Sequence, residues 1–215
     1  MNSVKVSLPL ILTILLSIGL TGPGNAQETY TNPILEKSGA DPAVLYHEGK
    51  YYAYTTNGKG LVFESSDLVH WEAGPQVIPD HLKGAWAPEV YHHPEDGKFY
   101  MYYTYRYKIG VAVADRPDEL FEDLGFIIIP SIDAHPFRDD DGQLYLYFVQ
   151  TPDSSIYVMP MYSPTEPGGP ATLCFEISQD WERHDHPINE GPWMMKMDGT
   201  YYLFYSGSNA QTIHY

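Results

Sequence analysis

The fold is decided by residues 131–148, SIDAHPFRDDDGQLYLYF. Asp133 comes just before a strand that begins with Pro136. The acidic residues before Gly142 form a turn, and a second strand with alternating aromatic residues follows the turn. Pro is tolerated as the first residue of a strand because its missing N–H is not needed there, and Asp-Gly supplies the positive φ of a tight hairpin. The stretch therefore predicts an antiparallel hairpin.

The same unit occurs three more times along the chain. In each, a Pro-led strand is followed 6 to 9 residues later by a Gly turn and then by an aromatic strand. The prolines that align are Pro42, Pro88, Pro136 and Pro192. Further short strands follow the aromatic strands, and four antiparallel strands in a unit of about 40 to 50 residues are typical of a propeller blade. We therefore predict an all-β propeller, because the competing β-sandwich does not require the same unit four times.

The fourth unit is incomplete, since the sequence ends at Tyr215 just after an aromatic strand. A blade of two or three strands leaves an open sheet edge, and an unclosed propeller exposes its terminal faces. We expect about three and a half blades in this chain, and at least the rest of the fourth blade in a complete gene product.

Residues 1–26 read as a signal peptide, which leaves 27–215 as the catalytic propeller domain. Lys5 is followed by the apolar run 6–20, and Gly24-Asn25-Ala26 offers small residues for cleavage. The alternative, a membrane anchor, lacks a basic stop-transfer segment. We expect a secreted or periplasmic protein with no membrane contact after cleavage.

The charge balance favours a neutral partner. The chain has 28 acidic against 12 basic residues and a formal net charge of −16. Such a surface repels phosphate backbones and anionic lipid, so we expect a carbohydrate substrate and no nucleic acid.

The single cysteine, Cys174, lies in an apolar run and is expected to be a small buried residue. The sequence does not indicate an oligomeric state.

Three carboxylates come from three different units. Asp41 stands directly before its Pro, Asp133 three residues before, and Glu190 two residues before, with Glu89 as a fourth candidate. The first strand of every blade lines the central channel, so these side chains are expected at one mouth. Clustered carboxylates repel, and the least solvated one is driven toward its protonated form, as glycoside hydrolysis requires. Any one of these carboxylates alone is explained as well by a role as a turn cap. Three of them at corresponding positions in three units favour a catalytic site.

Aromatic residues flank these positions. Trp86, Phe137 and Trp193 are candidates for stacking on sugar faces, and their alternative role is packing between blades. His135 is the histidine expected near the channel mouth. The pairs at 92–93 and 184–186 lack the spacing of a structural zinc site, so we assign no metal ligand.

With these motifs in place, the sequence resembles family 43 of the glycoside hydrolases, which are inverting enzymes with a five-bladed propeller. The matching stretches are DPAV (41–44), SSDLVHW (65–71), WAPEV (86–90), IDAHPF (132–137) with the turn DDDG (139–142), and NEGPW (189–193). The resemblance implies that Asp41 is the general base, Asp133 orients the acid and raises its pKa, and Glu190 is the general acid. It also implies an exported enzyme that cleaves arabinofuranosyl or xylosyl linkages in plant-type polysaccharides or oligosaccharides.

Two other implications stay open. Some members of the resembled family hold calcium on the propeller axis through a histidine of a later blade, but no calcium ligand is identifiable in this chain. The alternative function is a non-catalytic propeller that binds glycans or protein. A retaining fructan-cleaving propeller is disfavoured, because the chain has no Asn-Asp-Pro nucleophile near its mature start and no Arg-Asp-Pro stabiliser.

Overall fold

The computed structural model describes residues 39–183 and 186–208, and the predicted signal peptide, 1–26, lies outside them. The described residues form fifteen strands and two single-turn 3₁₀ helices, η1 (Asp80–Leu82) and η2 (Trp181–Arg183). The all-β prediction is therefore confirmed.

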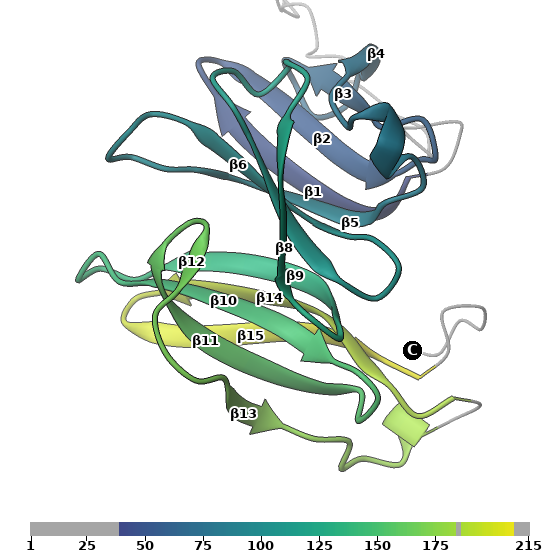
Figure 1. Ribbon diagram of the computed structural model, residues 1–215, viewed down its shortest axis with the longest axis vertical. Coiled ribbons are helices and arrows are strands. Elements are labelled where there is room, and N and C mark those ends of the chain that lie inside the picture. The colour runs from purple at the N-terminus through teal and green to yellow at the C-terminus, as the bar shows by residue number, and fades with distance from the viewer. Residues whose placement is uncertain (1–38, 184–185, 209–215) are drawn as a thin grey trace, which may run out of the picture. The chain divides into compact units, whose positions relative to one another are not determined.

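The strands form three complete blades and the first hairpin of a fourth, as predicted (Figure 1). Blade one contains β1 (Ala40–His47), β2 (Lys50–Thr56), β3 (Leu61–Ser65) and β4 (Glu72–Gln76). Blade two contains β5 (Trp86–His92), β6 (Phe99–Thr104), β7 (Ile109–Ala114) and β8 (Glu122–Ile128). Blade three contains β9 (Ser131–Arg138), β10 (Leu144–Gln150), β11 (Ser155–Ser163), and the short strands β12 (Glu166–Pro167) and β13 (Thr172–Phe175), which both pair with β11. Blade four begins with β14 (Asn189–Met197) and β15 (Thr200–Gly207).

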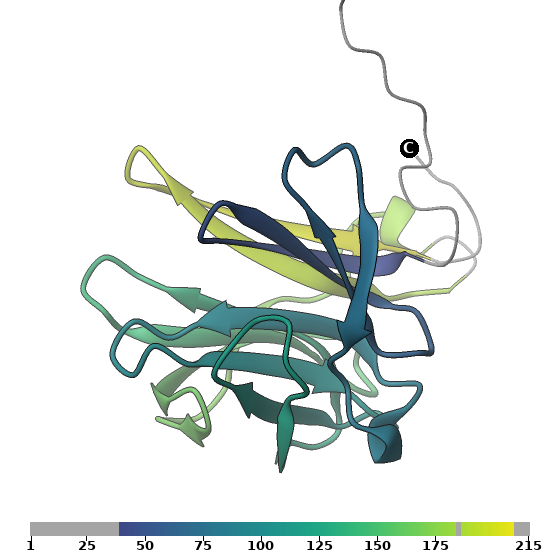
Figure 2. The same cartoon turned by 90° about the horizontal axis from the view of Figure 1, so that it is seen from above.

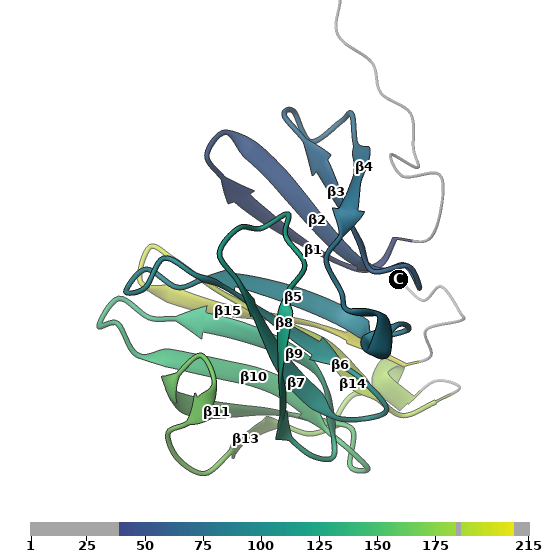
Figure 3. The ribbon, with the colours of Figure 1, turned by 45° about the horizontal axis from the view of Figure 1, so that its top comes forward.

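The first strands of successive blades lie next to one another. β1 contacts β5, β5 contacts β9, and β9 contacts β14, an order that can be followed in Figure 3. The β14–β15 hairpin, yellow in Figure 2, packs against blade three through β14, which contacts β9 and β10. This arrangement brings the start of each blade to a common region, as the sequence repeat predicts.

Hydrophobic cores lie between the blades. One cluster joins blades one and two, a second joins blades two and three, and a third lies between blade three and the fourth-blade hairpin. The aromatic strands supply many of their side chains, and buried hydroxyls find backbone acceptors: Tyr54 donates to Pro117 O (2.8 Å) and Tyr102 to Pro164 O (2.7 Å). Burial of apolar surface contributes about 25 cal/mol per Å², so these interfaces hold the blades together without a disulfide.

The expectation for Cys174 is wrong, because its side chain is exposed. It belongs to β13, the outermost strand of blade three, in which three of the four residues are exposed. The neighbouring Phe175 packs against the core between blade three and the fourth-blade hairpin, so an apolar sequence in this outer strand does not imply burial of every residue.

Every first strand carries the same backbone irregularity. In each blade the pairing with the second strand shifts register next to a residue with positive φ. These residues are Asp41 (51°), Ala87 (42°), Asp133 (54°) and Gly191 (59°). In blades one, two and four a Pro follows directly, whereas in blade three Ala134 takes that position and Pro136 comes later. The proline alignment therefore needs correction in blade three, since the repeated feature is the bulge.

Candidate active site

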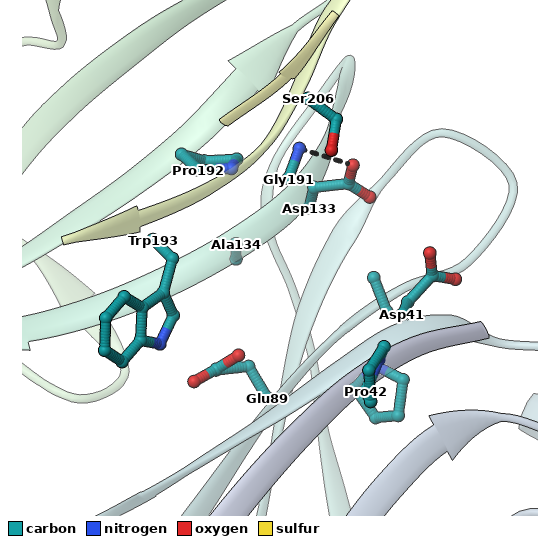
Figure 4. Close-up of a pocket in the computed structure, with 11 residues that line it drawn as sticks. Asp41, Pro42, Glu89, Asp133, Ala134, Gly191, Pro192, Trp193 and Ser206 are labelled. Carbon is teal, nitrogen blue, oxygen red and sulfur yellow. Dashed lines mark hydrogen bonds between the residues drawn. The ribbon is translucent and has the colours of Figure 1, made fainter. Parts of the chain in front are cut away.

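The bulges of the four blades line a pocket of about 370 Å³ (Figure 4). Such a volume is within the range of small-ligand sites. The lining residues are Asp41, Pro42, Ala87, Pro88, Glu89, Asp133, Ala134, Gly191, Pro192, Trp193 and Ser206. Most of them belong to first strands, which explains why segments far apart in sequence meet here.

An adjoining pocket of about 390 Å³ brings the three predicted catalytic residues together. Asp41, Asp133 and Glu190 all line it. The two pockets share Asp41, Asp133, Gly191 and Ser206, so they form one continuous candidate site. The expected grouping of carboxylates from blades one, three and four is thus found, while their individual roles remain predictions.

Asp41 is the exposed carboxylate of the group. Its Oδ2 accepts a hydrogen bond of 2.5 Å from the Thr56 hydroxyl. The same hydroxyl oxygen accepts a hydrogen bond of 2.8 Å from the Ala87 N–H of the next blade. The positive φ at Asp41 turns its side chain out of the regular strand pattern, toward the pocket (Figure 4).

Asp133 is more enclosed and is held on both sides. Its N–H donates to the Thr104 hydroxyl oxygen (3.0 Å), and its Oδ2 accepts from the Gly191 N–H (3.1 Å; dashed in Figure 4). Burial, followed by the negative charge of Glu190, raises the pKa of Asp133 to about 7, although the Gly191 hydrogen bond acts in the opposite direction. This carboxyl therefore exchanges its proton near neutral pH.

Glu190 precedes the bulge of blade four, where it pairs with Ser206 on β15. Burial raises the pKa of Glu190, and the charge of Asp41 raises it further, while His186 lowers it. Two of the three carboxyls thus bind a proton more tightly than an exposed acid does. An arrangement of this kind can keep one acid protonated beside an ionised one.

Two of the predicted aromatic residues line the site. Trp86 lines the second pocket together with Glu190. Its ring packs edge to face against that of Tyr107, with ring centroids 5.5 Å apart. Trp193 lines the first pocket and lies near Glu89 at the left of Figure 4. The side chains of Trp86 and Trp193 remain 38% and 45% exposed, which leaves ring surface available to a sugar.

Phe137 is placed elsewhere. Its ring contacts those of Tyr147 and Tyr201, with centroids 6.5 and 6.1 Å away, and it is not among the residues that line either pocket. Phe137 lies three residues beyond Ala134, the last residue of β9 that lines the first pocket, and by that point the strand has left the pocket.

His135 is buried beneath the site. Its Nε2 lies 3.1 Å from Met194 O, a contact that requires an Nε2–H donor. Its Nδ1 lies 3.3 Å from Glu89 Oε1. The imidazole therefore faces the pocket through Glu89, a carboxylate that lines it.

Several lining residues were not found from the sequence. Tyr107 and His186 come from connecting segments, and no pattern in the chain assigns such segments to the channel. Ser206 lies next to the end of β15 and lines both pockets, and Thr56, which contacts Asp41 without lining either pocket, ends β2. A sequence alignment on the bulge would have marked Thr56, because it pairs with the residue before Asp41.

Neither a metal centre nor a membrane segment emerges from the part of the chain that the structure describes. Residues 39–183 and 186–208 contain no group of three or more His, Cys, Asp or Glu side chains placed to hold a metal. Nor do these ranges include a helix with the length and apolar character needed to cross a bilayer.

Comparison with known proteins gives a consistent family. The model of glycosyl hydrolases family 43 matches residues 30–215. Extracellular exo-α-(1→5)-L-arabinofuranosidases of Streptomyces avermitilis and Streptomyces chartreusis are 26% and 28% identical over 87% and 86% of this chain. The chain spans 44% and 64% of the lengths of those two relatives.

Solved structures agree with the fold. A structure named endo-1,4-beta-xylanase from Bacteroides thetaiotaomicron VPI-5482 is 34% identical with a TM-score of 0.74, over 82% of this chain and 66% of that one. An α-L-arabinofuranosidase from Lactobacillus brevis is 23% identical with a TM-score of 0.70, over 83% and 66%. The second likeness supports the propeller fold alone.

Proposed function

Because the chain belongs to family 43 of the glycosyl hydrolases, we propose that the protein hydrolyses glycosidic bonds with inversion at the anomeric carbon. The observation that carries this proposal is the meeting of Asp41, Asp133 and Glu190, from three blades, in one pocket. Asp41 acts as general base, Glu190 as general acid, and Asp133 orients Glu190 and keeps its proton in place.

The reaction has one chemical step. Asp41 takes a proton from a water, the water oxygen attacks the anomeric carbon, and Glu190 donates its proton to the departing glycosidic oxygen. General acid and general base each contribute about 10²- to 10⁴-fold. The half-buried setting of Glu190, which raises its pKa, suits the protonated acid.

The proton that the general acid donates is shared by two carboxyls, those of Asp133 and Glu190. The pKa values of both Asp133 and Glu190 are raised, that of Asp133 to about 7. When two acids interact this strongly, the apparent pKa values describe the pair. The pair therefore takes up its first proton as the pH falls through about 7, and Glu190 is the member of the pair that passes a proton to the leaving group.

The substrate is a neutral saccharide. Arabinofuranosyl and xylosyl linkages are the best candidates, since relatives are named for arabinofuranosidase, xylosidase and β-D-galactofuranosidase activities. The net charge of −16 disfavours anionic polymers. Trp86 and Trp193 supply rings for the apolar sugar faces. Export through residues 1–26 matches a polysaccharide substrate outside the cell.

The test uses purified protein that contains this chain, with Asp41→Ala as the matched variant. Nitrophenyl arabinofuranoside and xyloside are the substrates, and proton NMR of the first sugar released reports its anomeric configuration. Inverted product that requires Asp41 supports the proposal. Oligosaccharide binding without any release supports the alternative, a non-catalytic propeller, and retained configuration overturns the inverting mechanism.

A further inference from the structure

Thr56, at the end of β2, is not used by the mechanism above. Its side-chain oxygen accepts the Ala87 N–H over 2.8 Å, and its hydroxyl donates to Asp41 Oδ2 over 2.5 Å. A hydroxyl carries a single hydrogen. Because the oxygen is already fixed by the amide of the neighbouring blade, that hydrogen is directed at the carboxylate.

We propose that Thr56 is a positioning residue for Asp41: it fixes Oδ2 of the carboxylate and leaves Oδ1 to receive the proton of the attacking water. The inference rests on the proposed function, because it assigns Asp41 the role of general base. The Ala87 amide polarises the Thr56 hydroxyl and strengthens its donation to the carboxylate.

Blade two shows what the same threonine does without a carboxylate. Thr104 occupies the position of Thr56, and its hydroxyl oxygen accepts the Asp133 N–H over 3.0 Å. In that blade the residue at the bulge is Ala87, which offers the hydroxyl no side-chain acceptor. The threonine-to-amide bond is therefore a repeated link between blades, and blade one adds a bond to the carboxylate.

Thr56→Val keeps the shape of the side chain and removes the hydroxyl. We expect kcat to fall about tenfold while KM changes less than about twofold, because a displaced base affects the chemical step and not substrate binding. Thr56→Ser retains the hydroxyl and should restore both values.

Thr55→Val is the matched control. Thr55 is buried next to Thr56 in β2, and its hydroxyl oxygen accepts a hydrogen bond from Asn57 Nδ2 (3.1 Å), away from both pockets. It reports the effect of losing a hydroxyl from this strand, and thermal unfolding of every variant checks the fold. If Thr56→Val does not fold, Thr56→Ala gives the same readouts.

The outcomes separate the two proposals. Wild-type kcat in Thr56→Val, with Asp41→Ala inactive, overturns the positioning role and leaves the proposed function standing. Equal losses in Thr55→Val and Thr56→Val also overturn it, because they indicate a general effect on β2. A wild-type protein that releases no sugar overturns the proposed function, and the role of Thr56 fails with it.

Discussion

Gly191 N–H donates a hydrogen bond of 3.1 Å to Asp133 Oδ2, so the carboxylate of blade three is held by backbone next to Glu190 in blade four. In the two preceding blades the corresponding amide is held by a threonine hydroxyl. Blade three has Val149 at that position, which has no hydroxyl. The candidate catalytic side chain therefore also serves as the link between two blades.

The first prediction concerns the stability cost of Asp133. Its pKa is raised from 3.8 to about 7, so the folded protein binds this proton more tightly than the unfolded chain. The contribution is most favourable below about pH 4 and is lost as the pH rises to about 7. Asp133→Asn cannot ionise, and its amide oxygen still accepts the Gly191 N–H. At pH 8 the variant should be more stable by about 4 kcal/mol, a Tm rise of roughly 8–16 °C, and at pH 4 the difference should be close to zero.

Thermal unfolding at the two pH values measures this effect. Asp141→Asn, in the exposed turn between β9 and β10, is the matched control for the loss of one carboxylate. A Tm difference for Asp133→Asn that is the same at pH 4 and pH 8 would contradict the assignment. The Asp133→Asn variant should also lose glycosidase activity. That loss would show that the carboxylate serves catalysis at a cost in stability.

The second prediction distinguishes the acid from the base. Glu190→Ala should lose about 10²- to 10⁴-fold in kcat on a natural linkage, whose alkoxide leaving group needs a proton. On a nitrophenyl glycoside the loss should be far smaller, because nitrophenolate leaves without protonation. Asp41→Ala should lose activity on both substrates alike. Comparable losses of Glu190→Ala on the two substrates would remove Glu190 from the role of acid.

The fold could be predicted further than the site. The blades could be predicted from the hairpin repeat, because Pro, Gly and alternating aromatic residues depend on the local backbone geometry of strands and turns. The bulge at Ala87 was not predicted, since positive φ at a non-glycine residue is imposed by the surrounding sheet and leaves no mark on composition. Tyr107 was missed for a similar reason, because its position depends on how a turn folds back over Trp86. By contrast, the carboxylates were identifiable because the repeat itself placed them.

The third prediction compares two aromatic residues from the same candidate list. Trp86→Ala removes a ring from the pocket wall and should raise KM about tenfold with a smaller change in kcat. Phe137→Ala should leave KM within about twofold, because its ring packs against Tyr147 and Tyr201. It should instead cost about 2 kcal/mol of unfolding free energy. Kinetics and chemical denaturation of both variants measure these values, and a KM effect of Phe137→Ala equal to that of Trp86→Ala would place Phe137 in the site after all.

The last prediction concerns close packing in blade two, which supports β5 and the site. Gly110 in β7 lies under the ring of Tyr103, so a Cβ at this position would overlap the ring. The ring cannot move freely, because its hydroxyl donates to Asp123 Oδ1 over 2.5 Å. Gly110→Ala should therefore destabilise the protein by about 1–3 kcal/mol. In a Tyr103→Ala background the same substitution should cost less than about 0.5 kcal/mol, because the overlap is gone, and chemical denaturation of the four proteins gives the coupling energy. Additive effects would show that the glycine is needed for a reason other than the Tyr103 ring.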